Sequence, residues 1–132
     1  MNGEPVPFRL DAASGVPFYR QVIDQVLLAV ADGRLAPGAQ LPTVRQLAVD
    51  LSVNLNTVAK AYREMEIRGI VETQQGTGTF VAARSARGGA AERRKALERL
   101  VDDLLARGAS RGFTTEEMAE AVAARTAGPK RR

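Results

Sequence analysis

From Thr43 to Val58 the chain reads TVRQLAVDLSVNLNTV, a pattern typical of two short helices joined by a sharp turn. Two helices that pack closely around a corner need a small residue where they meet, and Ala48 supplies it. Ser52 is the small residue that the turn favours, and Val58 is a β-branched residue suited to the inner side of the second helix. The remaining inward positions hold Leu47, Leu51, Val53 and Ala61. The stretch predicts a helix-turn-helix, while a purely structural helical hairpin would need similar residues at its contacts.

The outer face at the start of the second helix is polar. It carries Asn54, Asn56, Thr57 and Lys60. Asparagine and threonine side chains bond base edges or phosphates, and lysine reaches phosphates. A recognition helix presents its first turns to the major groove. The four residues are therefore candidate DNA contacts, and Asn54 is in addition a suitable N-cap. The alternative is that Asn54 only caps the helix and that the others are merely solvated.

Two β-rich runs follow this helix, at residues 70–75 and 79–82, and they enclose Gly76-Thr77-Gly78. Runs of this kind around a glycine-rich turn predict a hairpin. Glycine allows backbone N–H groups to approach a phosphate or the minor groove without a Cβ clash. Gly76 and Thr77 are thus candidate contacts at the tip of a wing. A nucleotide-binding loop is disfavoured, because neither a helix nor a Gly-Lys-Ser/Thr motif follows.

The segments before these motifs suggest a short lead-in and one more helix. Residues 8–10 suggest a short strand, and Pro17 stands where a helix can start. Apolar residues then recur at helical spacing up to Gly33, which suits a helix C-terminus.

Two amphipathic helices are expected after the hairpin, in residues 91–127, beyond a basic, glycine-bearing linker at residues 84–90. Their apolar positions would leave too much apolar surface for helices appended to a small domain, so we expect this segment to form a homodimer. The candidate dimer contacts are Leu97, Leu100, Val101, Leu104, Leu105, Met118 and Val122. Residues 128–132 form a basic tail, which is typical of a solvated chain end.

Composition excludes several classes of function. The 132 residues are 45% apolar and 26% charged, and they include no Cys and no His. Disulfides, Cys/His metal sites, thiol nucleophiles and histidine bases are therefore excluded. The net charge of +4 is uneven, because residues 1–83 carry −1 and residues 84–132 carry +5. Charge alone thus supports nucleic-acid binding only weakly. No signal peptide is visible, and the longest apolar run is too short to span a bilayer, so a cytoplasmic protein without membrane contact is expected.

Several separated motifs together resemble the GntR family of bacterial winged-helix transcription regulators. They are Pro17–Gln21, Gly33–Ala48, Asn54–Val58 and Gly76–Val81, and the resemblance covers roughly residues 8–83. The short remainder resembles the YtrA-like subgroup, in which two C-terminal helices dimerise the protein. The resemblance implies that Arg45 contacts DNA from the first helix of the motif. It implies the same for Asn54, Asn56, Thr57 and Gly76.

Three positions depart from the family pattern. Many members have arginine where this chain has Leu55 and Ala59, so those two contacts do not carry over and the operator should differ. Ser52 stands where glycine is usual, which is a mild change in the turn.

The predicted fold is mainly α with a small β-hairpin. A winged helix-turn-helix domain (residues 1–83) precedes a two-helix C-terminal dimerisation segment. The predicted function is that of a DNA-binding repressor whose homodimer binds a pseudo-palindromic operator, with no cofactor or metal and no enzymatic activity. The sequence does not identify an effector. The alternative is a winged-helix adaptor that binds proteins without sequence-specific DNA binding. An enzyme is disfavoured, because the carboxylates of Asp102-Asp103 and of Glu116-Glu117 point about 100° apart on a helix.

Overall fold

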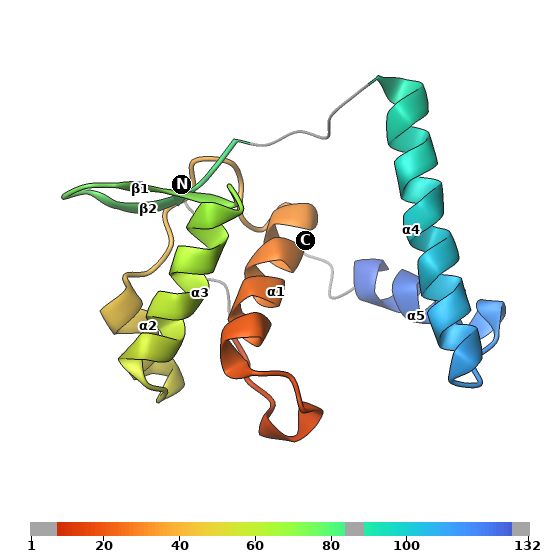
Figure 1. Ribbon diagram of the computed structural model, residues 1–132, viewed down its shortest axis with the longest axis horizontal. Helices are drawn as coiled ribbons and strands as arrows, with labels where there is room; N and C mark the ends of the chain where they lie inside the picture. The colour runs from red at the N-terminus through yellow and green to blue at the C-terminus, as the bar shows by residue number, and fades with distance from the viewer. Residues whose placement is uncertain (1–7, 84–88, 128–132) are drawn as a thin grey trace. The chain divides into compact units, whose positions relative to one another are not determined.

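The computed structural model describes residues 8–83 and 89–127, and the chain divides into two compact units, Met1–Arg84 and Ser85–Arg132. The first unit contains helices α1 (Phe18–Ala31), α2 (Val44–Leu51) and α3 (Leu55–Ile67), followed by strands β1 (Val71–Gln74) and β2 (Gly78–Val81) (Figure 1). The second unit contains α4 (Ala90–Ser110) and α5 (Thr115–Ala127). This architecture confirms the predicted fold of helices with one hairpin. Most of the predicted linker and the whole basic tail lie outside the described residues.

The lead-in to α1 corrects one prediction, because residues 8–10 form no strand. The backbone here bonds to side chains instead. Gln25 accepts a hydrogen bond from the Arg9 N–H (2.8 Å) and donates one to the Arg9 carbonyl (2.6 Å). Gln21 does the same for Asp11, at 2.8 and 3.0 Å. Two amides one helical turn apart thus satisfy the groups that a neighbouring strand would otherwise pair.

The turn between α2 and α3 is sharp and locally determined. Thr43 caps α2 by accepting a hydrogen bond from the Gln46 N–H (3.0 Å). Ser52 ends α2 in the left-handed conformation (φ 57°, ψ 44°), and the Val53 N–H then bonds back to the Ala48 carbonyl (3.1 Å). A residue with a Cβ is less stable in the left-handed conformation than glycine is, because its Cβ is crowded by the backbone. The conformation explains why glycine is the usual residue where this chain has Ser52.

The hairpin carries a third strand-like segment that the sequence did not reveal. β1 and β2 are antiparallel, with Val71 opposite Val81 and Gln74 opposite Gly78. On the other edge of β2, residues 39–41 pair with it: the Leu41 N–H donates to the Thr79 carbonyl (2.9 Å), and the Val81 N–H donates to the Ala39 carbonyl (2.8 Å). The chain before α2 therefore holds the wing against the helices.

The core of the first unit is a single apolar cluster drawn from its three α-helices and both strands. α1 packs on α3, α2 packs on α3, and α3 contacts β1. The buried apolar side chains of this cluster are Val22, Ile23, Val26, Ala29, Leu35, Leu41, Leu47, Ala48, Val58, Ala61, Tyr62, Met65, Ile70, Val71 and Val81. Ala48 and Val58 are among them, as the predicted helix-turn-helix requires.

The second unit is a helical hairpin with a close crossing. Thr114 and Glu117 form a reciprocal capping box at the start of α5, with bonds of 2.8 and 3.0 Å. Gly108 of α4 is buried, and the Met118 side chain occupies the space that a Cβ at Gly108 would fill. α4 begins at Ala90, which the sequence had assigned to the linker. Across residues 8–83 and 89–127, no helix has the length and apolar character needed to cross a bilayer.

Candidate nucleic-acid interface

The first turns of α3 present polar side chains to solvent. Asn54 is the N-cap, and its amide oxygen accepts a hydrogen bond from the Asn56 N–H (2.7 Å). The side chains of Asn56 and Lys60 are exposed, and Thr57 is half-buried. Asn54 therefore has the expected structural role as N-cap, and its side chain is also exposed. The predicted contacts on α3 lie together at the end of the helix that a recognition helix inserts into DNA.

Lys60 has a partner that sequence reasoning missed. Its ammonium nitrogen lies 4.2 Å from the centre of the Tyr19 ring on α1. A cation over an aromatic face is attracted to the ring, by about 0.5–1 kcal/mol at an exposed site. Tyr19 thus holds the Lys60 charge beside α3. The sequence placed Tyr19 inside a family motif, but no local signal connects it to a residue 41 positions further along the chain.

Arg45 is the second residue of α2, and its side chain is exposed. The position of α2 relative to α3 is fixed by Tyr62, whose buried hydroxyl donates a 2.6 Å hydrogen bond to the Pro42 carbonyl. Pro42 directly precedes Thr43, the N-cap of α2. The start of α2, which carries Arg45, is therefore tied to α3.

The tip of the wing is exposed and uncharged. Gly76 has a φ of 78°, and the Thr77 N–H donates to the Gln74 carbonyl (2.9 Å) to close the turn. Gln40, which sequence reasoning gave no role, donates from its amide nitrogen to the Thr77 carbonyl (3.2 Å). A Cβ at Gly78 would strike the same amide, so only glycine allows Gln40 this approach. Gln40 therefore sets the orientation of the tip that carries the predicted contacts Gly76 and Thr77.

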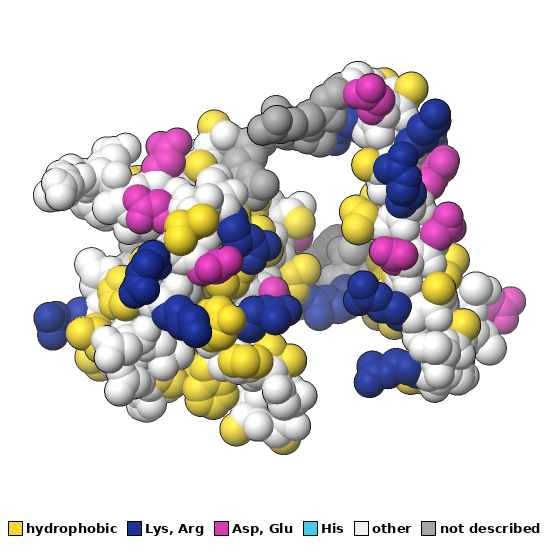
Figure 2. All heavy atoms as spheres, viewed as in Figure 1, with side chains coloured by type: hydrophobic (Ala, Val, Ile, Leu, Met, Phe, Trp, Pro, Cys, Tyr) yellow, Lys and Arg dark blue, Asp and Glu magenta, His cyan; other side chains and the backbone are white. Residues whose placement is uncertain are grey.

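The first unit has no net positive charge, but its Lys and Arg side chains are concentrated on the helices. Lys and Arg side chains lie over the helices in Figure 2, whereas the hairpin tip is uncharged. Arg45 and Lys60 are exposed on α2 and the first half of α3, while the exposed Arg63 directly precedes Glu64 and Glu66 in the second half. A unit with no overall positive excess thus still places cations where α2 and α3 begin, which is the pattern that phosphate contacts require.

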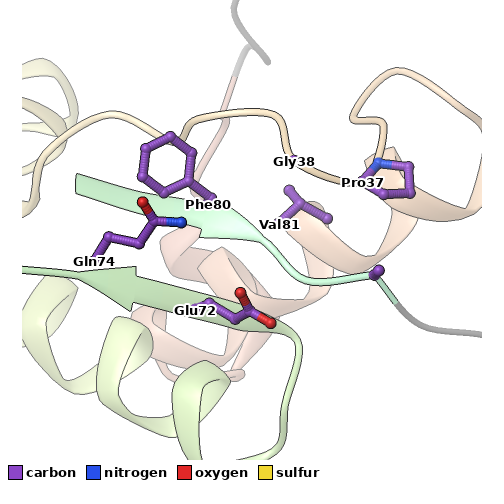
Figure 3. Close-up of a pocket in the computed structure, with 7 residues that line it drawn as sticks. Pro37, Gly38, Glu72, Gln74, Phe80 and Val81 are labelled. Atoms are coloured by element: carbon purple, nitrogen blue, oxygen red, sulfur yellow. The ribbon is translucent and has the colours of Figure 1, made fainter. Parts of the chain in front are cut away.

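A surface hollow of about 360 Å³ lies beside the hairpin (Figure 3). Glu72 and Gln74 line it from β1, and Phe80 lines it from β2. Its full lining is Pro37, Gly38, Glu72, Gln74, Phe80, Val81 and Ala83. None of the predicted DNA contacts takes part in it. Within the described residues, no group of acidic side chains is arranged to hold a metal ion.

The predicted dimer contacts form a stripe on α4 and a smaller set on α5. Leu97 and Leu100 are 60% and 66% exposed, and Val101, Leu104 and Val122 are also exposed. Leu105 and Met118 are half-buried. Met118 is in contact with Gly108 of the same chain, so it builds the helical hairpin itself. The predicted contacts on α4 that stay exposed are Leu97, Leu100, Val101 and Leu104.

Comparison with known proteins agrees with this geometry. Residues 18–81 match the family described as bacterial regulatory proteins, gntR family. The HTH-type transcriptional repressor YtrA of Bacillus subtilis (strain 168) is 43% identical over 74 residues, which are 56% of this chain and 57% of that protein. Three curated relatives that are 43–50% identical to the chain are matched over only 57–61% of their own length.

Two solved structures are similar as well. YtrA from Sulfolobus acidocaldarius, a GntR-family transcription factor, aligns with a TM-score of 0.59 and 32% identity, over 75% of this chain and 97% of that one. AraR(DBD) in complex with operator ORX1 aligns with a TM-score of 0.52 and 25% identity, over 61% of this chain and 100% of that one.

Proposed function

The chain belongs to the GntR family of bacterial regulatory proteins, and on that basis we propose that it is a transcriptional repressor that binds double-stranded DNA. The observation that carries the proposal is the exposed polar start of α3, together with the exposed Arg45 on α2 and a wing with an uncharged glycine tip. The relative named a repressor and the similar domain in complex with an operator support the same function. Such a function would place the protein in the cytoplasm, where bacterial DNA lies.

The residues divide into two roles within this proposal. Arg45 and Asn56 contact base edges, because arginine recognises guanine and asparagine recognises adenine in the major groove. Asn54, Thr57 and Lys60 contact phosphates and so position α3. Gly76 and Thr77 bring the wing to the backbone or the minor groove, where backbone N–H groups act as donors. Lys60 makes its contact from a side chain already held over Tyr19.

We further propose that the protein binds as a homodimer, through the exposed α4 stripe of Leu97, Leu100, Val101 and Leu104. A two-fold dimer presents two recognition helices, so the operator should contain two half-sites in pseudo-palindromic order. Repression then follows from occupancy of DNA that a polymerase needs.

The proposal includes no catalytic activity. The acidic pairs Asp102-Asp103 and Glu116-Glu117 are exposed on α4 and α5. Glu117 is already engaged, because its carboxylate accepts a hydrogen bond from the Thr114 N–H (2.8 Å). Glu117 therefore caps the start of α5, and the other three carboxylates are exposed to solvent.

Binding to DNA is tested with the full chain and a pool of random-sequence duplexes, followed by titration of the selected duplex at several salt concentrations. We expect affinity to fall steeply with salt, because phosphate contacts release counterions. Arg45→Ala should weaken binding by about 1–3 kcal/mol and relax the preference at one position of each half-site.

Arg34→Ala is the matched control, since Arg34 is an exposed arginine just beyond the end of α1 that pairs with Asp32 at 3.0 Å. Its affinity should equal that of the parent. If no duplex is selected, the adaptor alternative is favoured. If Arg45→Ala binds the selected duplex as the parent does, Arg45 has no role in recognition.

A further inference from the structure

The first residue of the recognition helix is apolar and exposed. Leu55 is 41% exposed, although the residues on either side of it, Asn54 and Asn56, are polar. It belongs neither to the buried core cluster nor to the partly buried apolar side chains that pack against that cluster. The fold of this unit therefore does not explain a leucine at this position.

Helix geometry puts Leu55 on a flank of α3, between its buried side and its outer side, at the end of the helix that enters DNA in the proposed function. Val58, Ala61, Tyr62 and Met65 are buried and define the inner side of the helix. At 100° per residue, Leu55 and Ala59 share one strip, which lies between the buried Tyr62 on one side and the exposed Arg63 and Asn56 on the other. Ala59 is half-buried and has a single methyl group, so its side chain adds little bulk beside Leu55.

The chemistry of this strip restricts what it can recognise. Neither Leu55 nor Ala59 has a side-chain donor or acceptor, so a base edge can meet them only through an apolar group. In the major groove the apolar group of a base pair is the C5-methyl of thymine, which is a known partner for apolar side chains.

We infer that Leu55, with Ala59 beside it, recognises the C5-methyl group of a thymine in each half-site. The inference rests on the proposed function, and it makes Leu55 a determinant of operator specificity. Where family members with arginine at these positions are suited to guanine, this chain should prefer a T·A pair.

The test replaces thymine by deoxyuridine, one position at a time, in the duplex selected by the full chain. This change removes only the methyl group and keeps every hydrogen-bonding group of the base. At one or two positions per half-site, we expect affinity to fall about fourfold for each methyl removed, the loss that corresponds to one buried methyl-sized group. In Leu55→Ala the same substitutions should have no effect, because the side chain that contacts the methyl is gone.

Ile67→Ala is the matched control, because Ile67 is an exposed apolar residue (74%) at the opposite end of the same helix. It should retain the full response to deoxyuridine. Leu55→Met should retain it as well, because methionine offers a similar apolar surface. Circular dichroism spectra of all variants should match the parent, since Leu55 lies outside the core.

The outcomes separate this inference from the function on which it rests. If no duplex is bound at all, both are wrong. If a duplex is bound specifically, but deoxyuridine has no effect or has equal effects on the parent and on Leu55→Ala, only the role of Leu55 is wrong. The same methyl group occurs in 5-methylcytosine, so a further arm replaces dC by 5-methyl-dC. A response to 5-methyl-dC alone would overturn the assignment to thymine.

Discussion

Tyr62 connects the two helices of the helix-turn-helix through one hydrogen bond. It is 7% exposed, and its hydroxyl donates to the Pro42 carbonyl at the start of α2 (2.6 Å). Burial raises the pKa of the Tyr62 phenol well above its ordinary value of about 10, because an ionised phenolate would lose its hydration. The phenol therefore stays protonated and keeps donating over the whole neutral range.

Tyr62→Phe should reduce the free energy of unfolding by about 1 kcal/mol at pH 7–8, since the Pro42 carbonyl loses its donor. The substitution should also remove the part of the pH dependence of the unfolding free energy that the Tyr62 hydroxyl causes. In the parent, the folded-state pKa is raised, so the unfolded phenol ionises first and stability falls as the pH rises above about 10, by up to about 1.4 kcal/mol per pH unit. Urea unfolding of both proteins at pH 8 and pH 11 checks this. A difference between them that is the same at both pH values would contradict it.

At the scale of helices and strands, the features that the sequence predicts depend on residues that are close together in the chain. The caps at Thr43 and Asn54 act over two or three residues, and the inward stripe of α3 follows from helical periodicity. The pairing of Gln40 with the wing and the contact of Lys60 with Tyr19 join residues 37 and 41 positions apart. Such contacts exist only after the core has brought α1, α3 and the hairpin together, so no local sequence pattern predicts them. The same reason explains the wrongly predicted strand at residues 8–10, whose backbone partners are side chains on α1.

The crossing of α4 and α5 depends on one pair, Gly108 and Met118. Gly108→Ala adds a Cβ where the methionine sulfur lies, so Met118 must leave its place. Methionine adapts readily, so we expect a modest net loss of about 1 kcal/mol in the free energy of unfolding.

The effect of Gly108→Ala on the free energy of unfolding should change sign once Met118 is replaced by alanine. In a Met118→Ala background, the new methyl group of Gly108→Ala no longer meets the methionine and should stabilise α4 by up to about 1 kcal/mol, because alanine favours helix over glycine. Urea unfolding of the four proteins at one concentration measures this coupling as a double-mutant cycle. Equal effects of Gly108→Ala in both backgrounds would show that the two residues do not interact.

At the scale of the whole molecule, the function proposed for the first unit depends on the second. One recognition helix reads a single half-site, and two half-sites are read together only if two chains are joined. The second unit has a surface suited to that purpose, because α4 exposes apolar side chains along one side while Asp102, Asp103 and Ala106 occupy the other. A stripe of this kind is stable in water when a second copy covers it.

Leu100→Glu places a charge in the middle of this stripe and should convert the dimer to a monomer at micromolar concentration, because burial of an unpaired carboxylate is costly. Affinity for a duplex with two half-sites should then fall by about 10²–10⁴, the contribution of linking two binding modules, while affinity for one half-site stays the same. Ala106→Glu adds the same charge on the opposite side of α4 and should change neither property. Sedimentation equilibrium, together with DNA titrations, measures both. If Leu100→Glu remains a dimer with full operator affinity, the chains must associate through another surface, and the α4 stripe does not mediate dimerisation.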